Sequence, residues 1–150
     1  MKFSKTLITA LIAVFSFAFA NAQTVDEHHK NLTQHHETIT KKTIELSNGT
    51  AQDKKKHTEE VGTNLDHAKK QHAEIMKKQS SADKTISQTH HDAIQKHHAS
   101  ATQHHEALKQ EVAKPNPDQA KVKQHSNNVA NDVNEAKKHH EEIKKKTAKK

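Results

Sequence analysis

The sequence has no cysteine, tryptophan or tyrosine, and only two glycines and two prolines. The absence of cysteine excludes a disulfide, a thiolate metal site and a lipid attached to a cysteine. Glycine-rich phosphate loops, nucleophile elbows and thiol nucleophiles have no residues from which to be built. A three-histidine zinc site with bound hydroxide is the one catalytic option, and nothing in the sequence indicates a substrate pocket around it. We therefore expect that the protein is not an enzyme.

Long apolar runs are also missing, apart from one near the N-terminus. Residues 1–22 begin with the basic stretch Met1–Lys5, continue with an apolar run over 6–19 and end in Ala20-Asn21-Ala22, which is typical of a signal peptide. The run is too short for a confident membrane span, and no second one follows it. We therefore predict cleavage before Gln23, a periplasmic or secreted product and no stable membrane insertion.

The chain after residue 22 has few side chains for a conventional core. It holds only 16 leucine, isoleucine and valine residues, and all four phenylalanines lie within residues 1–22. A content this low is typical of disordered chains, so a marginally folded or disordered protein is one interpretation. Histidine, in contrast, is abundant, with 16 residues that all follow residue 22. A folded core must therefore use imidazole in place of some apolar side chains.

The charged residues argue against several kinds of partner. The 25 basic residues are all lysine, and they are interleaved with 18 acidic residues rather than forming a basic stripe. Nucleic-acid-binding proteins usually combine basic patches with arginine forks or stacking aromatic side chains, and this chain has neither. Binding to a membrane surface would need Trp or Phe anchors, which are absent after residue 22. We therefore expect no nucleic-acid partner.

The sequence predicts four helices, over about 25–46, 51–78, 82–113 and 118–147, separated by turns near 47–49, 79–81 and 114–117. Each predicted start carries a Ser, Thr or Asn followed three residues later by an acid or Gln, a pattern that caps helix N-termini. The caps are Thr24, Thr50, Ser80 and Asn116, the last with Pro117 at the first helical position. Because short connections force neighbouring helices to run antiparallel, we predict an all-α, antiparallel four-helix bundle.

Two segments of the chain recur. The sequence of residues 33–37 returns 69 residues later, at 102–106, and that of residues 68–75 returns in similar form 68 residues later, at 136–143. Two copies of one helical hairpin, about 24–79 and 80–150, are the simplest explanation. Residues 23–150 are therefore predicted to form one histidine-rich bundle of two repeated hairpins. An apolar seam this thin could also be completed by a second copy of the chain or by a protein partner.

Histidine pairs recur every seven residues in the stretch 90–108, each followed at a fixed spacing by Ile94, Ala101 or Leu108. Seven residues are close to two helical turns, so these histidines form a row beside the apolar row. We predict that the first histidine of most pairs faces inward, together with Ile86 at the start of the same stripe. The other members of the pairs are interpreted as flanking residues: His29, His36, His91, His98, His105 and His139.

Folding the helices at the predicted turns brings histidines from different helices to the same height. One predicted layer, opposite the two hairpin turns, contains His28, His72, His90 and His140. A second, nearer the hairpin turns, contains His57, His104 and His125. A third, between them, contains His35 and His97. Imidazole nitrogens bind zinc, copper and nickel ions well, and layers of four or three histidines match the ligand number of a closed or an open zinc site.

The leading hypothesis is therefore an exported protein that binds or buffers divalent transition-metal ions, Zn, Cu or Ni, through these layers. Along one helix, histidines seven residues apart are separated by about 10.5 Å, so any site must be assembled across helices. No two histidines are three or four residues apart, the spacing that chelates an ion on one helix, and this counts against a dedicated high-affinity site. One alternative is a structural or partner-binding bundle whose seam histidines are neutral, hydrogen-bonded spacers. Another is a pH sensor whose helices separate when the seam histidines are protonated.

Overall fold

The computed structural model describes residues 23–148, and within that range the chain forms four helices and no strand. They are α2 (Val25–Leu46), α3 (Ala51–Lys78), α4 (Ser81–Val112) and α5 (Gln119–Thr147). The four predicted helices are confirmed, and their ends differ from the predicted ones by at most one residue. The predicted signal peptide, residues 1–22, lies outside the described residues.

Three of the four predicted caps are present. Thr24 and Thr50 each form a reciprocal capping box, in which the threonine hydroxyl accepts from the backbone amide three residues later and the acidic side chain there accepts from the threonine amide. Ser80 likewise accepts from the amide of Asp83. These contacts satisfy backbone donors that the first helical turn leaves free, so they fix where each helix begins.

The start of α5 differs from the prediction. Asp118 caps this helix, since its carboxylate accepts hydrogen bonds from the amides of Ala120 and Lys121. The amide of Asp118 donates to Glu111 Oε1 near the end of α4, at 2.9 Å. The predicted cap at Asn116 is wrong, because this anchored carboxylate two residues later binds the free amides, and the proline precedes the helix.

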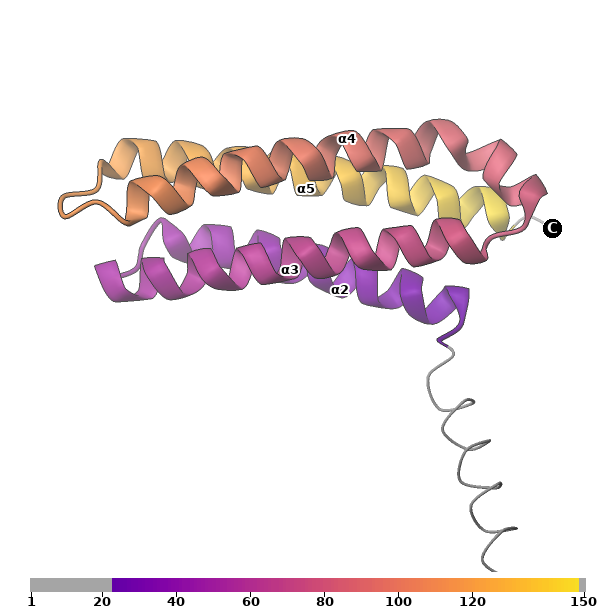
Figure 1. The fold of residues 1–150 in the computed structure, drawn as a ribbon, viewed down its shortest axis with the longest axis horizontal. Coiled ribbons are helices and arrows are strands. Elements are labelled where there is room, and N and C mark those ends of the chain that lie inside the picture. Colours follow the sequence, from indigo (N-terminus) through magenta and orange to yellow (C-terminus); the bar gives the residue numbers. More distant parts are fainter. Residues whose placement is uncertain (1–22, 149–150) are drawn as a thin grey trace, which may run out of the picture.

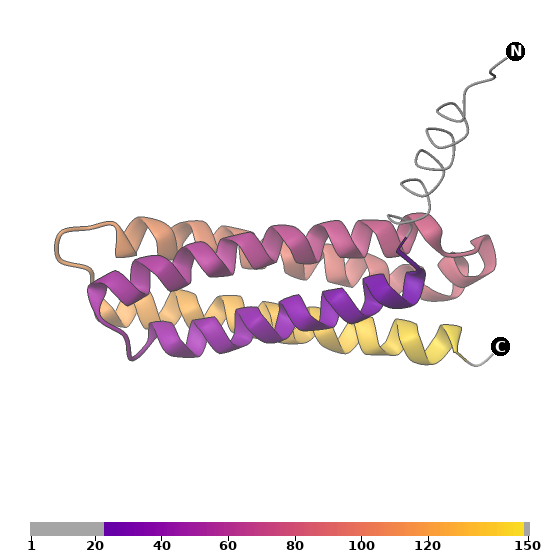
Figure 2. The same cartoon turned by 90° about the horizontal axis from the view of Figure 1, so that it is seen from below.

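The helices form an antiparallel bundle in which α2 packs against α3 and α5, and α4 packs against α5 and α3 (Figures 1 and 2). The connections α2–α3 and α4–α5 lie at one end of the bundle, and the short α3–α4 connection lies at the other (Figure 1). The predicted all-α four-helix architecture is therefore confirmed for the described residues.

Each helix buries residues at alternating spacings of three and four, which is the heptad seam of a left-handed helical bundle. In α4 this seam consists of Ser87, His91, Ile94, His98, Ala101, His105, Leu108 and Val112. In α5 it consists of Val122, Ser126, Val129, Val133, Ala136, His140 and Ile143. Ile86, predicted to face inward, is instead 44% exposed, because Ser87 occupies the seam position.

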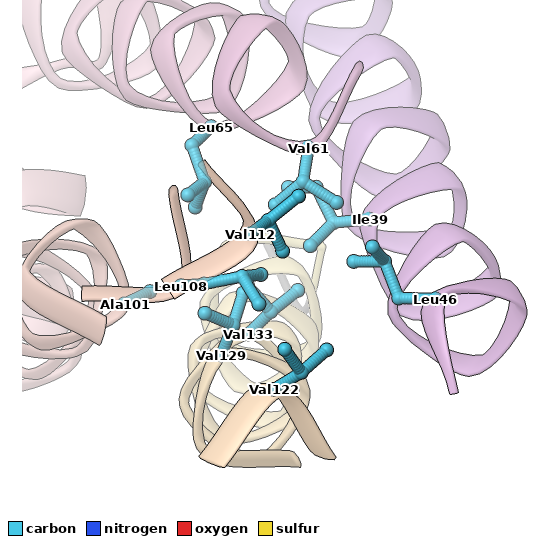
Figure 3. Packing of buried hydrophobic residues seen from close by; sticks show 10 residues of the cluster. All are labelled: Ile39, Leu46, Val61, Leu65, Ala101, Leu108, Val112, Val122, Val129 and Val133. Atoms are coloured by element: carbon cyan, nitrogen blue, oxygen red, sulfur yellow. The ribbon is translucent and has the colours of Figure 1, made fainter. Parts of the chain in front are cut away.

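The seam divides the bundle into two halves of different chemistry. The half beside the α2–α3 and α4–α5 connections, here called the turn half, holds one apolar cluster with members from all four helices (Figure 3). Its members are Ile39, Leu46, Val61, Leu65, Ala101, Leu108, Val112, Val122, Val129 and Val133. In the other half, here called the imidazole half, the apolar side chains form only two separate clusters of three residues. Buried histidines fill the space between them.

Candidate functional site

The structure places the second histidine of each pair in the seam. The buried seam histidines are His29, His36, His91, His98, His105 and His140, together with the unpaired His72. Most of the histidines predicted to face inward are half-buried at the edge of the seam: His35, His57, His90, His97, His104 and His125. The inward assignment of these six is wrong, and it is correct for His28, His72 and His140. His28 is buried beside His29, and His139 is half-buried.

This error has a simple cause in the heptad geometry. Leu32 lies four residues after His28 and three after His29, and both spacings fit a seam. A histidine pair next to one apolar residue therefore satisfies the pattern in either of two registers. The structure uses the second register in all four helices, with Thr58 and Ser126 in the seam rather than the histidines that precede them.

Six seam histidines form a connected network in the imidazole half, here called the histidine core: His29, His36, His72, His91, His98 and His140. Two of its hydrogen-bonded pairs lie between adjacent helices. His29 Nδ1 is 2.6 Å from His140 Nε2, with the rings stacked at 4.8 Å. His72 Nε2 is 3.0 Å from His91 Nδ1.

The third pair joins the other two. His36 Nε2 on α2 is 2.9 Å from His98 Nε2 on the diagonally opposite α4. The His36 ring also contacts the His140 ring at 6.4 Å, and the His98 ring contacts the His72 ring at 6.0 Å, both nearly perpendicular. All four helices therefore meet through imidazole in one continuous network.

Burial keeps the histidine core uncharged. It lowers the pKa of His29 to about 4, of His36, His72 and His98 to about 3, and of His140 to about 2. The pKa of His91 is lowered for the same reason. Neighbouring histidines add to the effect, since a proton on one ring disfavours a proton on the next. The predicted neutral, hydrogen-bonded imidazoles are therefore present, on a set of residues that overlaps the predicted one only at His72 and His140.

The predicted layers do not assemble as ligand sets. In the first layer each histidine contacts a residue outside it: His28 binds Gln71, His72 binds His91, His90 binds His139 and His140 binds His29. In the second layer the rings of His104 and His125 are 6.4 Å apart, but His57 lies between Glu45 and Glu60 instead. In the third layer His35 and His97 donate to Asn64 and Asp132 respectively.

The edge of the seam between α4 and α5 carries a row of half-buried ligand-type side chains. This α4–α5 flank consists of His90, His97 and His104 on α4 with His125, Asp132 and His139 on α5. Nδ1 of His90 is 3.1 Å from Nδ1 of His139, and the ring of His139 stacks on His97 at 5.9 Å. His97 Nδ1 donates to Asp132 Oδ1 at 3.2 Å, and the other oxygen of that carboxylate is 3.9 Å from His104 Nε2. Ligand-type contacts thus run along the whole flank.

The edge between α2 and α3 has the same contacts made by different residue types. This α2–α3 flank contains the residues at the corresponding heights of the bundle, namely His28, His35 and Lys42 with His57, Asn64 and Gln71. They lie 68 positions before those of α5 and 62 before those of α4, one heptad less than the 69-residue offset of the sequence repeat. His28 Nδ1 donates to Gln71 Oε1 at 2.6 Å, and His35 Nδ1 donates to Asn64 Oδ1 at 2.8 Å. The Lys42 ammonium is 2.9 Å from both Glu45 and Glu60, the carboxylates that also contact His57.

Within residues 23–148 no three or more His, Asp or Glu side chains are already arranged to hold one metal ion. None of the helices in that range is long and apolar enough to cross a membrane. No family model matches the chain, and neither a curated protein nor a solved structure matches it.

Proposed function

We propose that the protein is an exported, histidine-rich bundle that binds or buffers divalent transition-metal ions, Zn, Cu or Ni, at the α4–α5 flank. We further propose that its two hairpins are copies of one repeated unit, of which the second has acquired the ligands. The metal ligands in this proposal are His90 and His139, with His97, His104 and His125 as further imidazoles along the same edge. The other predicted ligands, in the core and on the α2–α3 flank, are not part of it.

The observation that carries the proposal is the contact between His90 and His139. Two nitrogens that each lie about 2.0–2.1 Å from a tetrahedral zinc ion are roughly 3.3 Å apart. The two Nδ1 atoms, on different helices, are 3.1 Å apart. An ion can therefore replace the proton between them with little movement of either helix. Partial burial also lowers the pKa of His90, so that its ring is neutral and able to ligate at neutral pH.

A carboxylate supports the same site. Asp132 accepts the Nδ1 proton of His97 and so leaves Nε2 of that ring with a lone pair, which is the arrangement that commonly orients a metal-binding histidine. The charges near His90 are mixed, since Lys146 lowers the pKa of its ring and Glu142, which is paired with Lys145, raises it, so Asp132 is the negative charge that supports the site. A divalent ion on this half-buried edge would therefore have both imidazole ligands and nearby compensating charge.

The α2–α3 flank supports the assignment by contrast. Where α5 has His139 and Asp132, α3 has Gln71 and Asn64, whose amides are weak ligands for zinc. Where α4 has His104, α2 has Lys42, whose ammonium already lies between two carboxylates. Because the two flanks share helix geometry, the first provides an internal control for the second.

Titration of the purified protein with Zn²⁺, Ni²⁺ and Cu²⁺ by calorimetry tests the proposal. We expect His90→Gln to weaken binding by about tenfold or more, a loss typical even of residues that only support a ligand. The matched variant His28→Gln makes the same change on the α2–α3 flank and should leave affinity unchanged. Gln71→His places an imidazole opposite His28 and should add a binding site. Equal losses in His90→Gln and His28→Gln would contradict the proposal.

The histidine core favours a second function, a response to acid. Below about pH 6.5 its rings remain uncharged only while they are buried, so protonation in mild acid is coupled to opening of the bundle. This function does not depend on the α4–α5 flank.

A further inference from the structure

A hollow of about 490 Å³ lies between α3 and α4, where it reaches the histidine core. His72 and His98 line it, together with Lys69, Ala73, Gln95 and Ala99. The two imidazole rings are 6.0 Å apart and nearly perpendicular. Each ring makes its hydrogen bond through Nε2, to His91 and His36 respectively. Nδ1 is therefore the atom of each ring that is available to a ligand in the hollow.

A chain of hydrogen bonds sets the proton on His72. His91 Nε2 donates to the amide oxygen of Gln79 at 2.7 Å, so Nδ1 of His91 must accept. It accepts from Nε2 of His72, at 3.0 Å. His72 Nδ1 therefore carries a lone pair rather than a proton. This is the second-shell arrangement that orients a histidine as a metal ligand.

A thioether contacts one of the residues that line the same hollow. Met76 follows His72 by four residues, hence on the same side of α3, and it is the only methionine after Met1. Its Sδ accepts a hydrogen bond of 3.4 Å from Nε2 of Gln95, which lines the hollow from α4. The methionine side chain has three rotatable bonds, so its sulfur can exchange the Gln95 amide for an ion.

The opposite face of the bundle has the same pair of imidazoles but closes over them. His36 corresponds in height to His98, 62 positions later, and His140 corresponds to His72, 68 positions earlier. In the described structure the Nδ1 atoms of His36 and His140 are buried without a hydrogen-bond partner. There the Lys137 ammonium forms an ion pair of 2.8 Å with Glu37 across α5 and α2. The residue of α4 at the position of Glu37 is Ala99, which is too short to reach across. A hollow of about 440 Å³ also lies between α2 and α5, but Glu37 and Lys137 line it and His36 and His140 do not. On the α3–α4 face, in contrast, His72 and His98 themselves line the hollow.

We propose that the α3–α4 hollow binds a monovalent soft metal ion, Cu⁺ or Ag⁺, through His72 Nδ1, His98 Nδ1 and Met76 Sδ. Imidazole and thioether ligands favour such ions. The three ligands are neutral and Lys69 also lines the hollow, so a divalent ion would bring two uncompensated charges into a buried site. This site shares no residue with the α4–α5 flank and does not depend on divalent binding there.

Titration of the protein with Ag⁺, which avoids the redox chemistry of Cu⁺, tests the site. We expect one Ag⁺ per chain, with shifts of the Nδ1 resonances of His72 and His98 in long-range ¹H–¹⁵N spectra and of the Met76 methyl resonance. Met76→Leu keeps the size of the side chain and removes the sulfur. Ala99→Glu allows an ion pair with Lys69 that closes the hollow, as Glu37 does on the other face. Each should weaken Ag⁺ binding by about tenfold or more.

Both variants change side chains outside the buried core, and circular dichroism will show whether they fold. Both variants should bind Zn²⁺ as tightly as the unaltered protein does, and His90→Gln should bind Ag⁺ normally. These controls distinguish an error in the proposed Ag⁺ site from an error in the proposed divalent site on the α4–α5 flank. Silver binding that is unchanged in both Met76→Leu and Ala99→Glu would overturn the proposal. Resonance shifts confined to His90 and His139 would do the same.

Discussion

The turn half and the imidazole half follow the same heptad seam, yet they are stabilised in different ways. In the turn half, branched aliphatic side chains from all four helices pack into one cluster. In the imidazole half, three pairs of rings take the central positions and leave two small apolar clusters on either side. Burial of aliphatic carbon is favourable at any pH, whereas burial of imidazole is favourable only while the ring is neutral.

Unsatisfied hydrogen-bonding groups add to the difference in stability between the two halves. A buried polar atom without a partner costs about 1–3 kcal/mol. In the described structure, four such atoms lie in the imidazole half, on His28, His36, Gln79 and His140, and two lie in the turn half, on His125 and Ser126. This half is therefore less favourable for folding than an aliphatic one of equal volume. Its imidazoles cannot be explained by stability alone, which is consistent with a role in binding or in response to pH.

A shift to acid pH should change the free energy of unfolding more than any substitution. In the unfolded chain a histidine has a pKa near 6.5, whereas five rings of the histidine core have folded-state pKa values of about 2 to 4. Below pH 6.5 the unfolded state therefore binds more protons, and the free energy of unfolding falls as the pH falls. Each ring contributes about 1.4 kcal/mol per pH unit, or about 7 kcal/mol per unit for five.

A loss of this size exhausts the stability of a typical domain, about 5–15 kcal/mol, within one to two pH units. We therefore expect cooperative loss of helicity by circular dichroism near about pH 4.5–5.5, and recovery at neutral pH. Hydrogen exchange should detect opening of the imidazole half before that of the turn half. A spectrum unchanged from neutral pH to about pH 4 would refute the neutral histidine core.

A cavity in the turn half should have the next largest effect. Leu108→Ala removes a fully buried side chain from the apolar cluster and should cost about 2–5 kcal/mol in urea unfolding. Because the lost contacts are aliphatic, the cost should be the same at about pH 7.5 and about pH 6.5. A cost that varied strongly between these values would show that the two halves are not chemically separate.

Replacing the central imidazole pair should separate stability from acid response. His36→Leu with His98→Leu removes both members of one hydrogen bond, so neither is left with a lost partner, and stability near pH 7.5 should change by less than about 1.5 kcal/mol. The dependence of unfolding free energy on pH should fall by about 2.8 kcal/mol per unit, the share of two rings. The control Ile94→Leu, in the same half, should keep the full dependence. Equal pH dependence in the two variants would contradict this account.

The helices and the bundle could be predicted from the sequence because their signals are local. Thr24 and Thr50 begin capping boxes that fix the starts of α2 and α3. The three breaks between helices lie within one residue of the predicted positions. Short connections then leave an antiparallel bundle as the simplest arrangement.

The orientation of the histidines could not be taken from the pairs, since adjacent residues fit the heptad equally well. The ends of the helices held the missing signal. Val112 follows His105 by seven residues, so the register of His105 contains an aliphatic residue where the register of His104 has Glu111. The same signal, Val133 seven residues before His140, gave the correct register in α5. The contacts across helices, such as His36 with His98 or His90 with His139, depend on helix rotation. A rotation of one residue changes every such contact, which is why the predicted layers were wrong.

The smallest predicted change in unfolding free energy concerns His105, the one seam histidine that lies in the turn half. In the described structure it makes no hydrogen bond to another histidine. Its Nε2 donates to the carbonyl oxygen of Thr58 at 2.8 Å, and its ring lies over Gly62, where an added Cβ would be 2.7 Å from Cε1. Gly62→Ala should cost about 1 kcal/mol net, because the ring must shift while alanine itself favours the helix by about 1 kcal/mol. In an His105→Ala background the same change should stabilise the protein by up to about 1 kcal/mol. The coupling between the two substitutions, measured by urea unfolding, should thus be about 2 kcal/mol. Additive effects would show that Gly62 does not serve to admit the imidazole, and that the turn half tolerates His105 for some other reason.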